Sequence, residues 1–120
     1  MARFKQDIVQ IDSGSTASEG SNTDGMLLSA IIFPSAMTGT TITMQWASSP
    51  GGWKNVVETD GTAVSYTVTA DSVVRVDPSC WAFGSTGFLR VVSGSTEGSA
   101  RKITLLYRES ERSTCLHLGS

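Results

Sequence analysis

Residues 40–48 read TTITMQWAS, and this stretch decides the fold because its side chains alternate between apolar and polar. Ile42, Met44 and Trp46 share one face of an extended chain, whereas the polar residues between them share the other. A period of two residues is typical of a strand with one buried face and one solvated face. The next four residues, SPGG at 49–52, have the composition of a turn. The stretch therefore predicts a strand of an antiparallel sheet, with Trp46 in the core.

The same pattern recurs along the chain at intervals of about ten residues, and no helical period competes with it. We expect strands over residues 3–11, 26–33, 40–48, 53–58, 63–69, 72–77, 87–93 and 101–108. Asp60-Gly61 predicts a tight hairpin turn, and residues 81–83 form a short apolar segment after Pro78. About eight short strands predict an all-β fold, a single antiparallel β-sandwich that is jelly-roll-like. An immunoglobulin-like Greek key has a similar strand spacing and stays open as an alternative.

The chain of 120 residues has the length of one ordinary domain. We expect a β-sandwich domain over residues 1–108 and a C-terminal tail over 109–120, in which the composition changes. The first residues are expected to project as an extended N-terminal arm. The sandwich contains a long polar loop at 12–25, and loops of this length are usually functional or mobile.

Composition excludes several classes of partner. The chain has 9 Lys and Arg against 11 Asp and Glu, so we expect no nucleic-acid partner. No apolar run approaches the roughly 20 residues of a membrane span, and the first residues lack the apolar core of a secretory signal, so we expect no membrane partner. Cys80 and Cys115 are too few for a disulfide framework, and we expect free thiols of a protein made in a reducing cytoplasm. Their oxidation stays open as an alternative, because it depends on the separation of the two Cα atoms in the fold.

No combination of residues in the sequence predicts catalysis. The single histidine, His117, lies in the tail, where it lacks the rigidly placed partners of a nucleophilic mechanism. Zinc binding needs three or four soft ligands, and the chain offers only His117 and two cysteines. The carboxylates of the central strands lie at strand ends and turns, where Asp usually caps the turn. We therefore expect a protein that is not an enzyme, with no catalytic, metal or cofactor site.

The tryptophans support a different kind of site, because aromatic rings on a β-sandwich can stack on sugars. Trp53 follows two glycines at the start of a strand, a position that favours exposure. Trp81 lies between Cys80 and Phe83, which is more typical of a core residue at a corner. Trp53 and Trp81 are the candidate glycan contacts of this alternative.

A series of turn glycines, core aromatics and strand aliphatics extends over about residues 26–108. It consists of Ile31-Ile32-Phe33-Pro34-Ser35-Ala36-Met37-Thr38-Gly39-Thr40, Gly52-Trp53, Val56-Val57, Asp60-Gly61, Tyr66-Thr67-Val68, Asp77-Pro78, Phe83, Phe88-Leu89-Arg90, Ser93-Gly94-Ser95 and Arg101-Lys102-Ile103-Thr104-Leu105. The series resembles small β-sandwich proteins encoded among the virion structural genes of tailed bacteriophages. It contains no catalytic residues, so the resemblance carries none to this chain.

The resemblance implies a capsid decoration or cement protein, made in the host cytoplasm and located on the capsid surface of the virion. The implied partners are the major capsid protein, whose neighbouring subunits it would clamp, and further copies of itself in a dimer or trimer. The candidate contacts lie outside the resemblance, in the loop at 12–25, in the arm at Arg3, Phe4 and Lys5, and in the tail at Leu116, His117 and Leu118. The alternative is a carbohydrate- or receptor-binding domain of a phage tail or head fibre.

Overall fold

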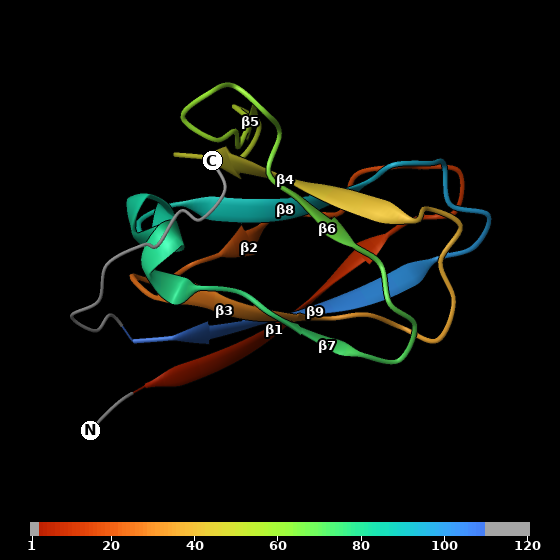
Figure 1. Cartoon of the computed structure of the whole chain (residues 1–120), viewed down its shortest axis with the longest axis horizontal. Helices are drawn as coiled ribbons and strands as arrows, with labels where there is room; N and C mark the ends of the chain where they lie inside the picture. The colour runs from red at the N-terminus through yellow and green to blue at the C-terminus, as the bar shows by residue number, and fades with distance from the viewer. Residues whose placement is uncertain (1–2, 110–120) are drawn as a thin grey trace.

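The computed structural model describes residues 3–109, whose strands are labelled in Figure 1. The strands are β1 (Phe4–Ile11), β2 (Ser21–Asn22), β3 (Leu27–Ile32), β4 (Thr41–Ala47), β5 (Lys54–Asn55), β6 (Ser65–Thr67), β7 (Val73–Arg75), β8 (Phe88–Ser93) and β9 (Arg101–Arg108). A 3₁₀ helix, η1, covers Pro78–Gly84. Residues 3–109 contain no α-helix, so the fold is all-β. Within them no helix has the length and apolar character that crossing a membrane requires.

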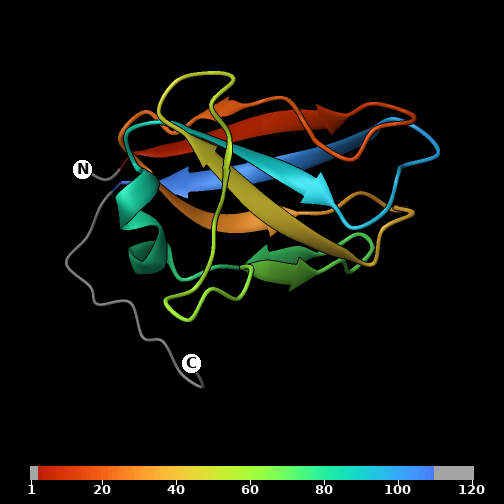
Figure 2. The same cartoon turned by 90° about the horizontal axis from the view of Figure 1, so that it is seen from above.

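Two antiparallel sheets pack face to face as a β-sandwich (Figures 1 and 2). The four-stranded sheet has the order β1-β9-β3-β7. The five-stranded sheet has the order β2-β8-β4-β5, and β6 also pairs with β4. Because β5 pairs with the second half of β4 and β6 with the first half, these two short strands share one position in the sheet. The expected antiparallel sandwich is therefore confirmed.

The strand pairing is nested, which identifies the topology. The first strand pairs with the last, β2 pairs with β8, β3 pairs with β7, and β4 pairs with β5 and β6. A chain that folds back on itself in this way and then rolls up is a jelly roll. An immunoglobulin-like sandwich, which places its first, second, fourth and fifth strands in one sheet, has a different strand order. The structure thus decides between the two topologies that strand spacing left open.

The core lies between the sheets and is filled by the inward residues of the longest strands. Ile42 and Met44 of β4 and Ile103 of β9 are fully buried, as the alternation predicts. Tyr107 near the end of β9 is also buried, and Trp46 packs half-buried against the core. Each large side chain that is fully buried contributes about 1.5–3 kcal/mol to stability. The inner faces of β4 and β9 therefore join the two layers.

The loop at 12–25 differs from the open connection that its composition predicts. Ser18 bridges to Ile11 of β1, and its amide donates a hydrogen bond of 2.8 Å to the carbonyl of Val91 in β8. The same loop contains β2, which extends the five-stranded sheet. Three of its hydroxyl side chains are buried and hydrogen-bonded: Ser18, Ser21 and Thr23. The loop is packed along the edges of both sheets, so it is part of the sandwich.

Residues 78–84 form η1, where the sequence predicts only a short apolar segment after a strand. Pro78 begins the helix at a position where the missing N–H costs nothing. Trp81 is buried, with its Nε1 donating to the hydroxyl of Tyr66 at 3.3 Å, and η1 lies at one end of the sandwich (Figure 2). Cys80 of this helix is disulfide-bonded, which corrects the expectation of a free thiol there. Cys115 lies outside the described residues.

Just before the start of β9, a buried carboxylate joins two of the connections between strands. Glu97, between β8 and β9, is fully buried and accepts hydrogen bonds from the amides of Thr38 (2.8 Å) and Gly39 (2.9 Å). It also accepts from the Ser93 hydroxyl at 2.7 Å and forms an ion pair with Arg101 Nε at 2.9 Å. Burial opposes ionisation, but the four donors outweigh it and lower the pKa of Glu97 to about 2. Glu97 therefore ties the β3–β4 connection to the β8–β9 connection.

Candidate functional site

The outer face of the four-stranded sheet carries three of the five large apolar side chains that are exposed within residues 3–109. These are Phe4 (74% exposed) and Ile8 (51%) of β1, and Val73 (56%) of β7. The register connects them, because Ile8 lies opposite Thr104 of β9, Thr104 opposite Ile32 of β3, and Ile32 opposite Val73. One row of side chains therefore crosses all four strands. We call this surface the outer apolar face.

The outer apolar face comprises Phe4, Ile8, Ile32, Val73 and Leu106. Arg75, Lys102 and Arg108 occupy further strand positions on the same side of the sheet. No strand position on this side within the described chain is acidic, although the whole chain has a net charge of −2. The face is thus apolar and locally cationic. An exposed apolar patch with a charged surround is typical of a surface that binds another macromolecule.

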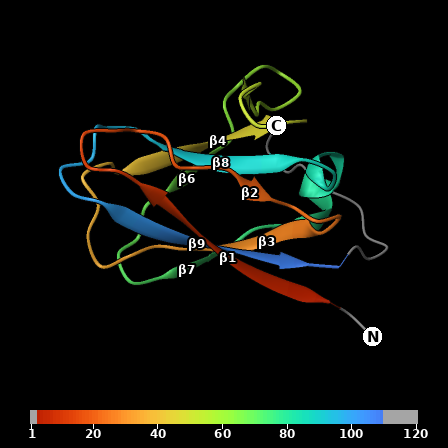
Figure 3. The ribbon, with the colours of Figure 1, turned by 180° about the vertical axis from the view of Figure 1, so that it is seen from behind.

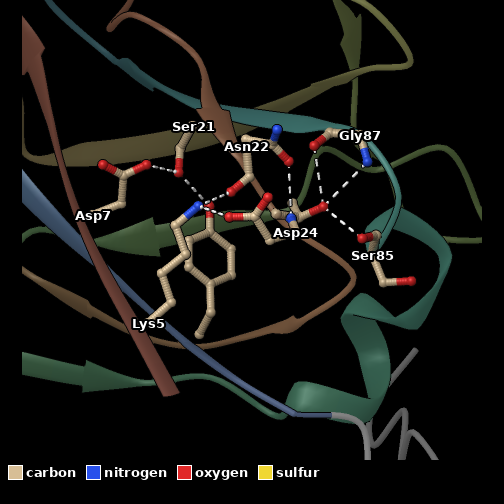
Figure 4. Close-up of polar contacts among 9 residues, drawn as sticks. Lys5, Asp7, Ser21, Asn22, Asp24, Ser85 and Gly87 are labelled. Atoms are coloured by element: carbon tan, nitrogen blue, oxygen red, sulfur yellow. Dashed lines mark hydrogen bonds and ion pairs between the residues drawn. The ribbon is translucent and has the colours of Figure 1, made fainter. Parts of the chain in front are cut away.

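A polar network on the inner side of β1 holds this strand in place (Figure 4). The hydroxyl of Tyr107 in β9 donates to Ser21 Oγ at 2.8 Å, and Ser21 Oγ donates to the Asp7 carboxylate at 2.5 Å. Lys5 forms an ion pair of 2.5 Å with Asp24, which lies between β2 and β3. The network joins both sheets, because Asp7 and Tyr107 belong to β1 and β9 of the four-stranded sheet and Ser21 belongs to β2 of the five-stranded sheet. Figure 3 shows these strands from behind. Consequently β1 presents its outer residues from a fixed backbone.

The two consecutive hydrogen bonds that link Tyr107, Ser21 and Asp7 stabilise the fold and are not a reactive site. Ser21 and Tyr107 are each only 1% exposed, so no substrate can reach either hydroxyl in this conformation. Burial raises the pKa of Tyr107 above its ordinary value, and the nearby charges of Asp7 and Asp24 raise it further. Tyr107 therefore stays a neutral hydrogen-bond donor at any physiological pH.

A second apolar feature is an open cleft of about 610 Å³ between η1 and the β5–β6 connection. Val57 (50% exposed) and Phe83 (55%), the other two exposed large apolar residues, belong to its lining. Glu58 and Asp77 also line it, and no Lys, Arg or His does so within the described residues. The cleft is therefore apolar like the outer apolar face but opposite in charge. Its volume lies in the range of small-molecule sites.

The structure places Phe4 and Lys5 in β1 and Arg3 directly before it, which corrects the expectation of a projecting arm. Phe4 pairs with Arg108 of β9, and the carbonyl of Arg3 accepts a hydrogen bond of 2.9 Å from the amide of Glu109. Phe4 and Arg3 are exposed, whereas Lys5 turns inward to Asp24. Of the three predicted residues, only Phe4 belongs to the outer apolar face. The tail contacts Leu116, His117 and Leu118 lie outside the described residues.

The two tryptophans of the glycan alternative have little free ring surface. Trp81 is 3% exposed, so it is a core residue and the idea that it contacts a glycan is wrong for this conformation. Trp53 is half-buried, and the guanidinium of Arg90 lies 4.6 Å from the centre of its ring. The backbone of Gly20 also packs on this ring, because a Cβ there would approach ring atoms to 2.9 Å. Trp53 is thus held between its neighbours.

Sequence reasoning missed Ile32, Val73 and Leu106 as surface residues. Phe4 and Ile8 lie on one side of β1, as alternation along a strand requires. The remaining members come from three other strands, and the register that aligns them depends on pairing partners far along the chain. The available signal was the alternation of residues 101–108, which puts Leu106 on the same outward side as Lys102 and Arg108. Within residues 3–109, no group of three or more His, Cys, Asp or Glu side chains is arranged to hold a metal ion.

Comparison of the sequence with protein-family models and with curated proteins finds no match.

Proposed function

We propose that the protein is a non-enzymatic structural protein of a phage virion, a decoration or cement protein that binds the outer capsid surface and clamps neighbouring major capsid subunits. The observation that carries the proposal is the outer apolar face, which is exposed over a sheet whose other side is the core. The resemblance of residues 26–108 to small virion β-sandwich proteins supports the class. Jelly rolls also serve as capsid domains, although lectins use the same fold.

The chemistry of the face predicts the chemistry of its partner. Apolar side chains such as Ile8 and Val73 gain from burial, at about 25 cal/mol per Å² of surface removed from water. The cations Arg75 and Lys102 favour an approach to acidic groups. The proposed docking site on the capsid is therefore an apolar surface with Asp or Glu side chains around it. Association should weaken as salt screens these charges.

The test is co-sedimentation of the purified protein with mature capsids that lack it, beside unexpanded procapsids. We expect saturable binding to the mature capsid at a fixed ratio to the coat protein. Val73→Glu places a carboxylate in the outer apolar face and should weaken binding by about tenfold or more. Val57→Glu is the matched control, because Val57 is a valine of similar exposure in the cleft.

Two results would contradict the proposal. Binding to neither particle would exclude a capsid partner and favour the alternative, a carbohydrate- or receptor-binding domain of a tail or head fibre. Equal losses from Val73→Glu and Val57→Glu would show that the outer apolar face is not the contact.

A further inference from the structure

We propose that two copies of the chain associate through the open edge of β1 and form a two-fold symmetric dimer with one continuous sheet. The proposal concerns the isolated protein and does not depend on capsid binding. It rests on the direction of the backbone groups along β1 and on the order of the side chains from Phe4 to Ile8.

β1 is the edge strand of the four-stranded sheet, with β9 on one side (Figures 1 and 3). The chain after β1 covers only the second part of the other side. There the carbonyl of Gln10 accepts a hydrogen bond of 3.3 Å from the amide of Glu19, and Ile11 bridges to Ser18. Residues 4–8 have no backbone partner on this side within the described chain. An open stretch of strand edge is a template for pairing with another strand.

The hydrogen bonds of β1 show which residues face the open edge. In a strand, the N–H and C=O groups of one residue point to the same side, and successive residues alternate. The carbonyl of Arg3 faces β9, where it accepts from Glu109, whereas the carbonyl of Gln10 faces the open side. By alternation, Phe4, Gln6 and Ile8 present their N–H and C=O groups to the open edge.

These three residues define one symmetric register. With the two-fold axis at Gln6, an antiparallel second copy places its own Gln6 opposite Gln6 and its Ile8 opposite Phe4. Each of the resulting pairs is of the hydrogen-bonded kind, in which both N–H groups donate to the opposite carbonyls. The pairing uses the whole open stretch and stops where Glu19 begins to cover the edge.

The side chains of this stretch are complementary to themselves in that register. On the outer side, Phe4 meets Ile8 of the second copy, which is a favourable aromatic and β-branched cross-strand pair. On the inner side, Lys5 lies opposite Asp7 of the second copy. Moving the axis by one residue in either direction puts Lys5 opposite Lys5 or Asp7 opposite Asp7, and like charges directly opposite are destabilising.

Lys5 also explains why the partner is a second copy. A lysine in an edge strand normally blocks the addition of other strands. Here Lys5 is compatible with an added strand if that strand carries a carboxylate at the opposite position. In the symmetric register, Asp7 of the second copy supplies this carboxylate. The dimer would double the outer apolar face, because Phe4 and Ile8 of both copies meet at its centre.

The first test measures the mass of the purified protein in solution by sedimentation velocity and light scattering. We expect a particle of twice the chain mass. Gln6→Pro removes an N–H that faces the open edge and is not bonded to β9, so it should raise the dissociation constant by about tenfold or more. Gln10→Pro is the matched control, because Gln10 faces the same side but lies beyond the open stretch. A monomeric wild-type protein, or equal effects of the two variants, would overturn the proposal.

The second test uses charge exchange. Lys5→Asp puts Asp opposite Asp, and Asp7→Lys puts Lys opposite Lys, so each variant alone should be monomeric. Each substitution also removes a contact within its own chain, the ion pair of Lys5 with Asp24 or the hydrogen bond from Ser21 to Asp7, so recovery of a dimer in the mixture is the decisive readout. In a mixture of the two, each strand carries the charge that the other requires, and a heterodimer should form. Circular dichroism on each variant shows that it is folded before mixing. Dimers of either single variant, or a mixture of folded variants that stays monomeric, would contradict the β1 pairing.

Discussion

A polar network holds β9 at each of its ends, and the two networks differ in what they bury. At the start of β9, the fully buried group is an ionised carboxylate, Glu97, which accepts hydrogen bonds from Thr38, Gly39 and Ser93 and forms an ion pair with Arg101. Near the end, the buried group is the neutral hydroxyl of Tyr107, which needs one acceptor, and the charge lies further out on Asp7. A buried charge requires complete compensation, whereas a buried hydroxyl requires one bond. The first network should therefore be stronger and sensitive to acid.

The largest effect is expected when the buried carboxylate is removed. Glu97→Ala leaves the amides of Thr38 and Gly39 without their acceptor and the Arg101 guanidinium without its ion-pair partner. We expect a loss of about 3–5 kcal/mol in the free energy of unfolding, measured by urea denaturation. Glu19→Ala, which removes an exposed glutamate, is the control and should change stability little. A small loss from Glu97→Ala would mean that the two ends of β9 are equivalent.

Acid should weaken the Glu97 network next. The pKa of Glu97 is about 2 in the folded chain, below its ordinary value of 4.5, so the unfolded chain binds the proton first as the pH falls. The stabilisation is complete above about pH 4.5 and is lost as the pH falls towards 2, a change of about 2–3 kcal/mol. Urea denaturation between pH 4.5 and pH 2 gives the free energy of unfolding of the wild type and of Glu97→Gln. We expect the wild type to lose its advantage over the variant as the pH falls. If the difference in free energy of unfolding between the two proteins stayed constant with pH, ionised Glu97 would not be the source of this stabilisation.

The smallest of the three effects on stability is expected near the end of β9, at Tyr107. Tyr107→Phe removes one buried hydrogen bond but leaves Ser21 Oγ able to donate to Asp7. We expect a loss of about 1 kcal/mol in the free energy of unfolding. The loss should be the same at neutral pH and at about pH 5, since the Tyr107 hydroxyl does not ionise in that range. A loss as large as that of Glu97→Ala would remove the distinction between the two networks.

The strands with strict alternation could be predicted from the sequence. In residues 42–46 and 103–107 every second side chain is apolar, and Ile42, Met44, Ile103 and Leu105 are all fully buried. β2 was missed because it is two residues long and polar, and only its pairing with β8 makes it a strand. η1 was missed because Trp81 and its neighbours have the same composition in a strand and in a helical turn.

The sites depend on information that a local pattern does not contain. Glu97 stands in a Gly- and Ser-rich loop, which predicts a solvated side chain, and its donors Thr38 and Gly39 come from a connection far away in the chain. Gly39 is required there, because a Cβ would lie 2.1 Å from Ser93 Oγ. The outer apolar face likewise needs the register of four strands, of which alternation predicts only the side each residue faces.

The pairing of the first strand with the last also sets when the protein can fold. At roughly 5–20 residues per second, a ribosome finishes β9 several seconds after β1 has left the exit tunnel. Until then β1 lacks its only neighbour in the four-stranded sheet, and β3 lacks one of its two. Folds dominated by pairings between distant residues are slow, on the order of milliseconds to seconds even for complete chains. The nascent chain therefore exposes the apolar side chains of β1 and β3 until β9 is complete, and exposed strands of this kind favour aggregation.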